Sequence, residues 1–321
     1  MAQAPFVIQP RLTAITLTYL NEAFIADSVL PRVLVDSQQF KWSRYTLADG
    51  FTIQDTRVGR KSAPNQIDWT ATEVSDTTND YGLDDAIPNF DIQAAAAASD
   101  IQGVNPIDPE ARSTMLLSEL VGLDRERRVA DLAFTLGTYP AANRTTLAGA
   151  TQWSDAASDP LGAILNAFDS CVIRPNIAVL GQAVWTKLRT HPKITAAVYP
   201  SGGNATGGPT VVARQAVAEL LEIEEVLVGS GWYNSAKPGQ TPVMTRLWGK
   251  HAAFLYRPQS IIDTKSVAFG FTAQWGSRIA GTIGEDPKIG MRGGRWVRVG
   301  EAVKEVVAAN DAAYFFQNAV A

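Results

Sequence analysis

The sequence predicts an α+β protein in which helices and strands are segregated along the chain instead of alternating in repeated strand–helix–strand units. A long helix is expected from Asp108 to Gly137, because Asp108 can cap it, Pro109 suits its first turn and Gly137 ends it. Two later segments, Val267 to Trp275 and Trp296 to Val307, alternate apolar and polar side chains, which is the pattern of half-buried strands.

Composition narrows the class of protein further. The chain has 321 residues, of which 46% are hydrophobic and 19% charged, so it can bury a large core. A net charge of −4 disfavours a sequence-independent nucleic-acid binder. Cys171 is the one cysteine, which allows no internal disulfide and indicates an intracellular folding compartment. The N-terminus lacks the pattern of a signal peptide, and no apolar run approaches the roughly 18 residues of a transmembrane helix.

The N-terminal third predicts a polar ribbon. A short helix is expected within Thr13 to Ala26, followed by a strand at Phe40 to Tyr45. Phe51 to Val58 and Ile67 to Val74 then indicate two further strands on either side of a polar tip at Gly59 to Gln66. Such a hairpin has few apolar residues of its own to form a core.

Charge is unevenly distributed around this ribbon. Residues 40–61 hold five basic groups against two acids, whereas residues 62–111 hold ten acids and neither lysine nor arginine. A charge run of this kind is commonly a solubilising surface. The alternative is electrostatic complementarity between a basic hairpin on one copy of the chain and an acidic strap on another.

The long helix is predicted to change its buried face. Its first half places Leu116, Leu120 and Leu123 on one side, and its second half carries a different stripe that includes Val129 and Leu132. The charged run between them offers two favourable pairs four residues apart, Asp124 with Arg128 and Arg127 with Asp131.

The rest of the chain predicts a mixed lobe and an extended hairpin. Asp159-Pro160 repeats the capping signature and opens a helix to Ser170. Further helices are expected at Gln182 to Arg189 and Pro209 to Leu221, with strands at Ile177 to Leu180, Ile223 to Val228 and Gly249 to Tyr256. Thr282 to Gly294 is rich in glycine and is predicted to be an exposed loop, and the apolar tail from Tyr314 to Val320 is expected to return to a core.

The sequence contains little that indicates catalysis. Its two histidines, His191 and His251, have no metal-ligand spacing around them, and Cys171 is expected to be a buried, inert thiol. We therefore predict no catalytic residues, no cofactor and no metal. Arg292 and Arg298 can share a strand face with Trp296, and we interpret this cluster as a subunit contact rather than a nucleic-acid site.

The order of these parts resembles the major capsid proteins of tailed bacteriophages, which have the Hong Kong 97-type shell fold. The stretches "FKWSRY", "FTIQDTRVGRKSAPNQIDW" and "IDPEARSTMLLSELVGLDRERRVADL" carry the resemblance, together with the layout of nearly the whole chain. The resemblance implies an N-terminal arm (1–38), an extended E-loop hairpin (39–74), and a P domain with acidic strap and spine helix (75–150). It further implies an A domain (151–258), P-domain strands with a P-loop (259–308), and a return to the A domain (309–321).

The resemblance also implies a structural function. The chain would self-assemble into the pentamers and hexamers of an icosahedral phage head, in the virion, after assembly in the host cytoplasm. It would enclose double-stranded DNA without sequence-specific binding and without membrane contact. Its expected partners are separate scaffolding and portal proteins, with a decoration protein as a further candidate. The same fold would also suit an encapsulin-like nanocompartment, and a hydrolase of unknown type is a third hypothesis.

Three sets of residues are the predicted contacts between subunits. The E-loop set is Asp55, Arg57, Arg60, Lys61 and Trp69. The acidic-strap set is Asp76, Asp80, Asp84 and Asp85, and the P-loop set is Lys288, Arg292 and Arg295.

Overall fold

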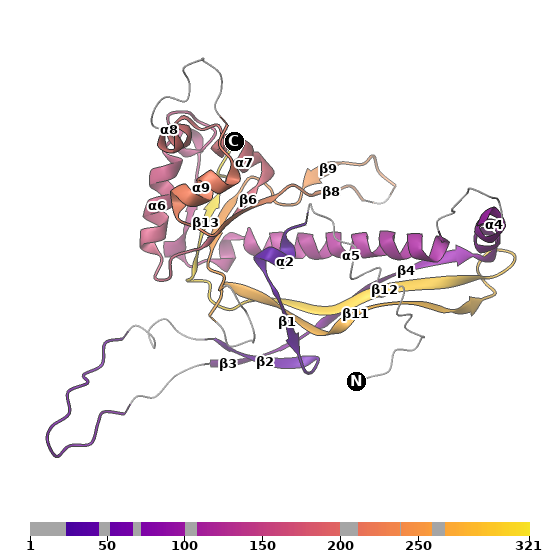
Figure 1. Cartoon of the computed structure of the whole chain (residues 1–321), viewed down its shortest axis with the longest axis horizontal. Coiled ribbons are helices and arrows are strands. Elements are labelled where there is room, and N and C mark those ends of the chain that lie inside the picture. Colours follow the sequence, from indigo (N-terminus) through magenta and orange to yellow (C-terminus); the bar gives the residue numbers. More distant parts are fainter. Residues whose placement is uncertain are drawn as a thin grey trace.

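A computed structural model describes residues 24–44, 52–66, 72–99, 108–199, 211–237, 239–258 and 267–321. It has two parts, a lobe of helices around a five-stranded sheet and an elongated part in which one long helix lies along a four-stranded sheet (Figure 1). The predicted mixture of helices and strands is confirmed, but the strands are not fully segregated, because residues 177–181 and 225–229 form parallel strands with helices between them in the chain. No helix in these ranges is long and apolar enough to cross a membrane.

The long helix α5 (Pro109–Ala133) begins where the sequence predicts. The side chain of Asp108 accepts a hydrogen bond from the backbone N–H of Glu110 at 3.1 Å, and Pro109 occupies the first turn. The helix ends at Ala133, earlier than predicted, and a 3₁₀ turn, η1 (Leu136–Thr138), follows. Tyr139 fixes this end, because its hydroxyl donates to the carbonyl oxygen of Ala133 at 2.6 Å.

The predicted change of buried face in α5 was wrong. One row of side chains four residues apart, which includes Leu117, Val121 and Val129, stays buried along the helix. Leu116 and Leu120, which were expected to be buried, are 52% and 50% exposed. The helix therefore keeps one face on the protein and leaves an apolar strip uncovered on another. The two predicted ion pairs, Asp124 with Arg128 and Arg127 with Asp131, are present.

The elongated sheet has the strand order β1-β11-β12-β4, in which β1 is Arg32–Val35 and β4 is Asn79–Pro88. The long antiparallel hairpin of β11 (Gly270–Asp286) and β12 (Gly294–Val307) confirms the two predicted strands. The predicted exposed loop from Thr282 to Gly294 was wrong for its first part, because β11 continues to Asp286 and only residues 287–293 form the turn. Gly284, the one glycine of this first part, lies at an irregularity in the pairing of β11 with β12, and Gly290 and Gly293 have positive φ in the turn.

A strand near the N-terminus belongs to this sheet. Of the residues expected to form an N-terminal arm, 24–38 contain α2 (Ala26–Val29) and β1 (Arg32–Val35), which pairs in parallel with β11. Leu30 and Val33 are buried, so this stretch is part of the body of the protein. The helix expected within Thr13 to Ala26 lies mostly outside the described residues, and Phe24 and Ile25, at its end, are not helical.

The predicted ribbon has a different pairing. β2 (Gln39–Arg44) pairs antiparallel with β3 (Thr72–Thr77), and residues 52–58, which were predicted to be a strand, are not in one. Trp42 on β2 contacts Phe271 edge to face at 6.5 Å, which anchors the base of the ribbon to the sheet. Local alternation predicted strands in this region, but it could not reveal which distant segments would pair.

The acidic strap is also not one extended segment. β4 (Asn79–Pro88) pairs with β12, and α4 (Asn89–Ser99) follows it directly. The run Ala94 to Ala98 lies in this helix, as its high helix propensity favours. Residues 100–107, the last part of the predicted strap before Asp108, lie outside the described residues.

The lobe is built on a sheet of order β5-β13-β10-β6-β7. Its strands are β5 (Arg144–Thr146), β6 (Ile177–Gly181), β7 (Glu225–Gly229), β10 (Ala252–Leu255) and β13 (Ala313–Gln317). The helices of the lobe are α6 (Pro160–Ser170), α7 (Gln182–Leu188), α8 (Pro192–Val198) and α9 (Arg214–Leu221), and a short hairpin, β8 (Trp232–Asn234) with β9 (Met244–Arg246), extends over α5 (Figure 1).

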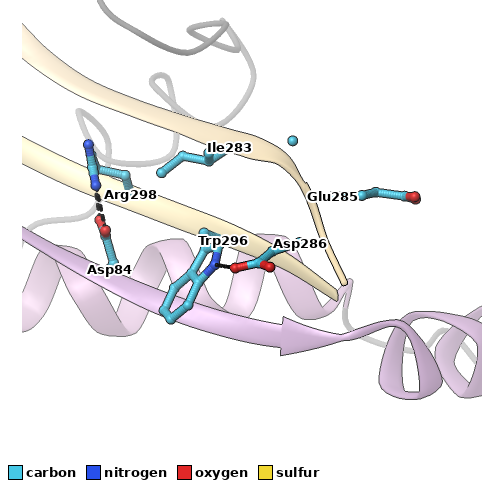
Figure 2. A pocket seen from close by; sticks show the side chains of 7 residues that line it. Asp84, Ile283, Glu285, Asp286, Trp296 and Arg298 are labelled. Carbon is cyan, nitrogen blue, oxygen red and sulfur yellow. Dashed lines mark hydrogen bonds and ion pairs between the residues drawn. The ribbon is translucent and has the colours of Figure 1, made fainter. Parts of the chain in front are cut away.

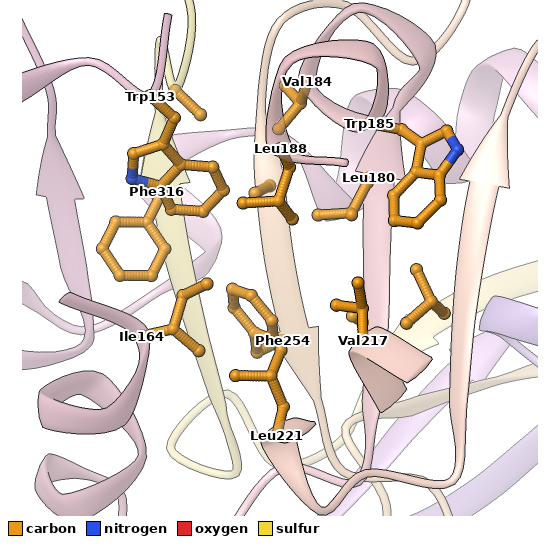
Figure 3. Close-up of a cluster of buried hydrophobic side chains, with 14 of the residues drawn as sticks. Trp153, Ile164, Leu180, Val184, Trp185, Leu188, Val217, Leu221, Phe254 and Phe316 are labelled. Carbon is orange, nitrogen blue, oxygen red and sulfur yellow. The ribbon is translucent and has the colours of Figure 1, made fainter. Parts of the chain in front are cut away.

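Most predictions for the lobe are confirmed to within a few residues. The helix after Asp159 spans the predicted range, and the C-terminal tail does return to the core through β13. Trp153, Phe254 and Phe316 pack together with Ile164 and Leu180 between the sheet and its helices (Figure 3). The helix α8 and the hairpin β8–β9 were not predicted.

Buried charges join the two parts of the molecule. The carboxylate of Glu126 accepts hydrogen bonds from the backbone N–H of Ile25 at 2.9 Å and of Ala26 at 2.8 Å, and from Trp248 Nε1 at 2.5 Å. Arg125, next to it on α5, pairs with Asp27 of α2 and bonds Thr272 of β11 at 3.1 Å. Burial raises the pKa of Glu126, although these hydrogen bonds act in the opposite direction.

Glu301 is the centre of a second buried cluster. Its carboxylate lies 2.7 Å from Arg32 Nη1 and 2.9 Å from Arg278 Nε, and its side chain is fully buried. Burial alone would raise its pKa, but the charges and hydrogen bonds of the two arginines lower it below the ordinary value. This cluster links β1 to β11 and β12.

Replacing Glu301 with Gln should lower the free energy of unfolding by about 3 kcal/mol at neutral pH, because two arginines would lose their buried counter-charge. The depressed pKa means that the stabilisation is complete above the ordinary value of 4.5 and is lost as the pH falls through the folded-state pKa. Urea unfolding between pH 7 and pH 3.5 should therefore show a steeper loss of stability below pH 4.5 in the original protein than in Glu301→Gln.

Glu224→Gln is the matched control, since Glu224 is exposed on the lobe. It should behave like the original protein at every pH. The same pH dependence in the Glu301→Gln variant and the original protein would show that the cluster does not contribute in this way.

Candidate functional site

Residues 52–66 form a segment that lies away from the rest of the protein (Figure 1). Every residue in it is exposed, and Ile53 is 97% exposed. A turn at the predicted tip is closed by a 3.0 Å hydrogen bond from the N–H of Ser62 to the carbonyl of Gly59. Asn65 Nδ2 donates to the carbonyl of Asp55 at 2.8 Å and holds the two sides together. We call residues 52–66 the projecting segment.

Four of the five predicted E-loop contacts lie on this segment. Arg57, Arg60 and Lys61 are exposed, and within the described ranges no ion pair joins them to a carboxylate. Asp55 caps the local backbone, because its carboxylate accepts the N–H of Arg57 at 2.9 Å. Trp69 lies outside the described residues. Among the described residues, these three positive charges therefore have no carboxylate that pairs with them.

The predicted acidic strap is largely paired within its own chain. Asp84 receives two hydrogen bonds from Arg298, at 2.7 and 2.6 Å, and Asp85 accepts one from the hydroxyl of Ser113 at 2.6 Å. Asp76 lies 3.7 Å from the ammonium of Lys304. Asp80, opposite Ala302 in the sheet, is exposed. The strap therefore offers a weaker negative surface than the count of its acids predicts.

The predicted P-loop residues divide between two positions. Lys288 and Arg292 are exposed in the turn between β11 and β12, at the far end of the elongated part. Arg295 instead pairs with Glu110 of α5 at 3.2 Å and with Glu285 at 3.6 Å, so it holds the hairpin against the start of the helix. The sequence did not indicate that apolar side chains would be exposed here, yet Met291 and Phe90 both are.

A shallow hollow of about 480 Å³ lies on the sheet near this tip, lined by Asp84, Ile283, Glu285, Asp286, Trp296 and Arg298 (Figure 2). The carboxylate of Asp286 accepts hydrogen bonds from the N–H of Lys288 at 2.9 Å and from Trp296 Nε1 at 3.1 Å. Both bonds lower the pKa of Asp286, and the bond from Lys288 has the larger effect. A carboxyl held ionised cannot act as a general acid near neutral pH. Trp296 and Arg298 share this hollow as predicted, but Arg292 does not reach it.

The remaining reactive side chains have structural partners. His191 Nε2 lies 3.1 Å from the carbonyl oxygen of Asp155, and His251 Nδ1 accepts the N–H of Asn318 at 3.0 Å. Cys171 is buried, and burial raises its pKa to about 11, which keeps it a thiol. Among the residues that the structure describes, no group of three or more His, Cys, Asp or Glu side chains could hold a metal ion.

Comparison with known proteins gives a consistent result. A family model described as "Phage major capsid protein E" matches residues 138–288. The major capsid protein of Pseudomonas phage JBD67 is 46% identical over 321 residues, which is the whole of both chains.

Solved structures show the same fold. The crystal structure of a phage-related protein from Bordetella bronchiseptica has a TM-score of 0.73 at 19% identity, covering 99% of this chain and 98% of that one. The capsid structure of cyanophage P-SCSP1u has a TM-score of 0.56 at 11% identity, over 99% and 92% of the two chains. Because the Pseudomonas phage relative matches along its full length, the chain belongs to the family of phage major capsid proteins.

Proposed function

We propose that this chain self-assembles into the pentamers and hexamers of an icosahedral phage head that encloses double-stranded DNA. The observation that carries the proposal is the projecting segment, every residue of which is exposed in the isolated subunit. An extended segment of this length costs conformational free energy to order, at about 1–2 kcal/mol per residue, so it needs a surface to pack against. A neighbouring subunit would supply that surface.

The parts of the structure correspond to those of the Hong Kong 97-type fold in this proposal. Residues 39–74 act as the E-loop, α5 and the four-stranded sheet form the P domain, and the lobe forms the A domain near the symmetry axis of each capsomer. The base of the E-loop is fixed by Trp42 and Phe271, while the projecting segment is free to reach another copy. Many such contacts of modest strength would add up in a closed shell.

Charge complementarity would direct these contacts. Arg57, Arg60 and Lys61 would meet carboxylates of the neighbour, and Asp55 and Trp69 belong to the same proposed contact. Of the acidic strap, the exposed Asp80 is the main candidate, because Asp76, Asp84 and Asp85 each have a partner in their own chain. Lys288 and Arg292 would contact other subunits at the tip of the β11–β12 hairpin.

A subunit of this kind needs no catalytic residues, and we propose that the protein is not an enzyme. The side chains that could do chemistry, His191, His251 and Cys171, are held in structural contacts. The net charge of −4 suits an inner wall that does not bind DNA tightly. Scaffolding, portal and decoration proteins as partners, and assembly in the host cytoplasm, belong to the same proposal.

Deleting residues 53–65 should leave a folded subunit that does not form shells, because the segment contributes nothing to the core of its own chain. Circular dichroism and thermal unfolding would report the fold, and negative-stain electron microscopy would report the shells. Replacing the same residues with a Gly-Ser sequence of equal length is the control for chain connectivity, and it should also abolish assembly. Normal shells from the deletion would contradict the assignment of this segment.

Reversing Arg57, Arg60 and Lys61 to Glu should reduce the yield of shells several-fold, because three attractions become repulsions between subunits. The loss should be greatest at low salt and smaller near 1 M salt, where charges are screened beyond about 3 Å. Light scattering during assembly measures the effect.

The matched control reverses three exposed basic residues of the lobe and its hairpin, Lys187, Arg214 and Lys237, which changes the net charge equally. It should assemble with a much smaller defect. An unchanged yield from the E-loop variant at low salt, or an equal loss in both variants, would count against charge complementarity at this contact.

A further inference from the structure

An apolar groove runs beside the middle of α5 and is separate from the assembly contacts proposed above. It has a volume of about 420 Å³ and is lined by Phe24, Leu116, Glu119, Leu120, Leu123, Ser230, Gly231 and Trp232. Leu116, Leu120 and Trp232 are between 48% and 52% exposed. Three large apolar side chains that are half-exposed on one concave surface indicate a place that another segment covers.

Both walls of the groove are held in place. One wall is α5 itself, and the other is the hairpin β8–β9, which carries Trp232. The guanidinium of Arg246 lies 3.8 Å from the ring of Trp232, and that of Arg127, on α5, lies 4.8 Å from the ring of Tyr233. The hairpin is thus tied to the helix, and the groove is a built feature of the subunit.

The described chain begins inside this groove. Phe24, its first residue, lines the groove and packs on Gly122 of α5, where a side chain would come within 3.1 Å of its ring. A glycine in the middle of a long helix is unfavourable, so this one indicates close packing of the ring. Glu126 fixes the direction of the chain by binding the N–H groups of Ile25 and Ala26. Phe24 is therefore fixed inside the groove, with the backbone that follows it anchored on α5.

The sequence just before Phe24 has suitable chemistry. Ile15, Leu17, Tyr19 and Leu20 supply large apolar side chains within Thr13 to Leu20, and that stretch contains no charge. The groove along Leu116 to Leu123 is roughly 10 Å long, at about 1.5 Å per helical residue. Ile15 to Leu20 lie nine to four residues before Phe24. At about 3.3 Å per extended residue they can reach about 13–30 Å from Phe24, so their side chains can lie along the groove.

We propose that residues 13–20 of the same chain occupy this groove and cover the exposed strip of α5. The N-terminal segment would then be held in cis on the spine helix by apolar contacts with Leu116, Leu120 and Trp232. Chain continuity favours the subunit's own segment over that of another copy, because its effective concentration at the groove is far higher.

The test measures the accessibility of the groove in the full-length chain. Leu120→Cys places a thiol there, and the native Cys171 gives little background because it is buried. The rate of maleimide modification is measured in dilute, unassembled subunits, with and without the further substitutions Ile15→Asp and Leu17→Asp. We expect the aspartates to speed modification of Leu120→Cys at least fivefold.

Leu34→Cys is the control, because Leu34 on β1 is 75% exposed. It should react with maleimide at the same rate with and without the two aspartates. Leu116→Cys repeats the measurement if Leu120→Cys does not fold. Equal rates for Leu120→Cys in both backgrounds would overturn the proposal. Protection that appears only in assembled shells, and survives the aspartates, would also overturn it, because another copy would then cover the groove.

Discussion

The packing of α5 through one buried row of side chains is the constraint on which the rest of the structure depends. That row contains Arg125, and Glu126 is buried beside it; both charged groups are stable there only because partners surround them. Glu126 holds Ile25 from the N-terminal segment and Trp248 from the lobe, and Arg125 holds Asp27 beside β11. One turn of helix therefore sets the positions of the N-terminal entry, the elongated sheet and the lobe relative to one another.

Sequence reasoning succeeded where the signal was local. Asp108-Pro109 and Asp159-Pro160 predicted two helix starts correctly, because capping and proline geometry are decided within one turn. It failed where partners are distant in sequence. The pairing of β2 with β3, and the extension of β11 through a glycine-rich stretch, depend on strands that local alternation cannot identify. Arg125 and Glu126 were not predicted to be buried, although Arg125 lies four residues from both Val121 and Val129, a spacing that could have placed it in the buried row.

The predicted contact residues also divide into those that a local signal could indicate and those that depend on partners distant in sequence. The sequence correctly indicated that Arg57, Arg60 and Lys61 lie on a segment without a core of its own. It could not show that Asp84 and Arg298 are bound to each other, because they are far apart in the chain and adjacent only through the pairing of β4 with β12. The proposed picture is a subunit whose histidines and cysteine are held in structural contacts. A basic segment extends from it, and among the described residues no carboxylate pairs with its arginines or lysine.

Cryo-electron microscopy of particles formed by the purified chain would show how the subunits meet. We expect closed shells of pentamers and hexamers in which residues 52–66 lie on an adjacent subunit, with Arg57, Arg60 and Lys61 near its carboxylates. Monomers or small oligomers under all assembly conditions, or shells in which this segment packs against its own subunit, would contradict it.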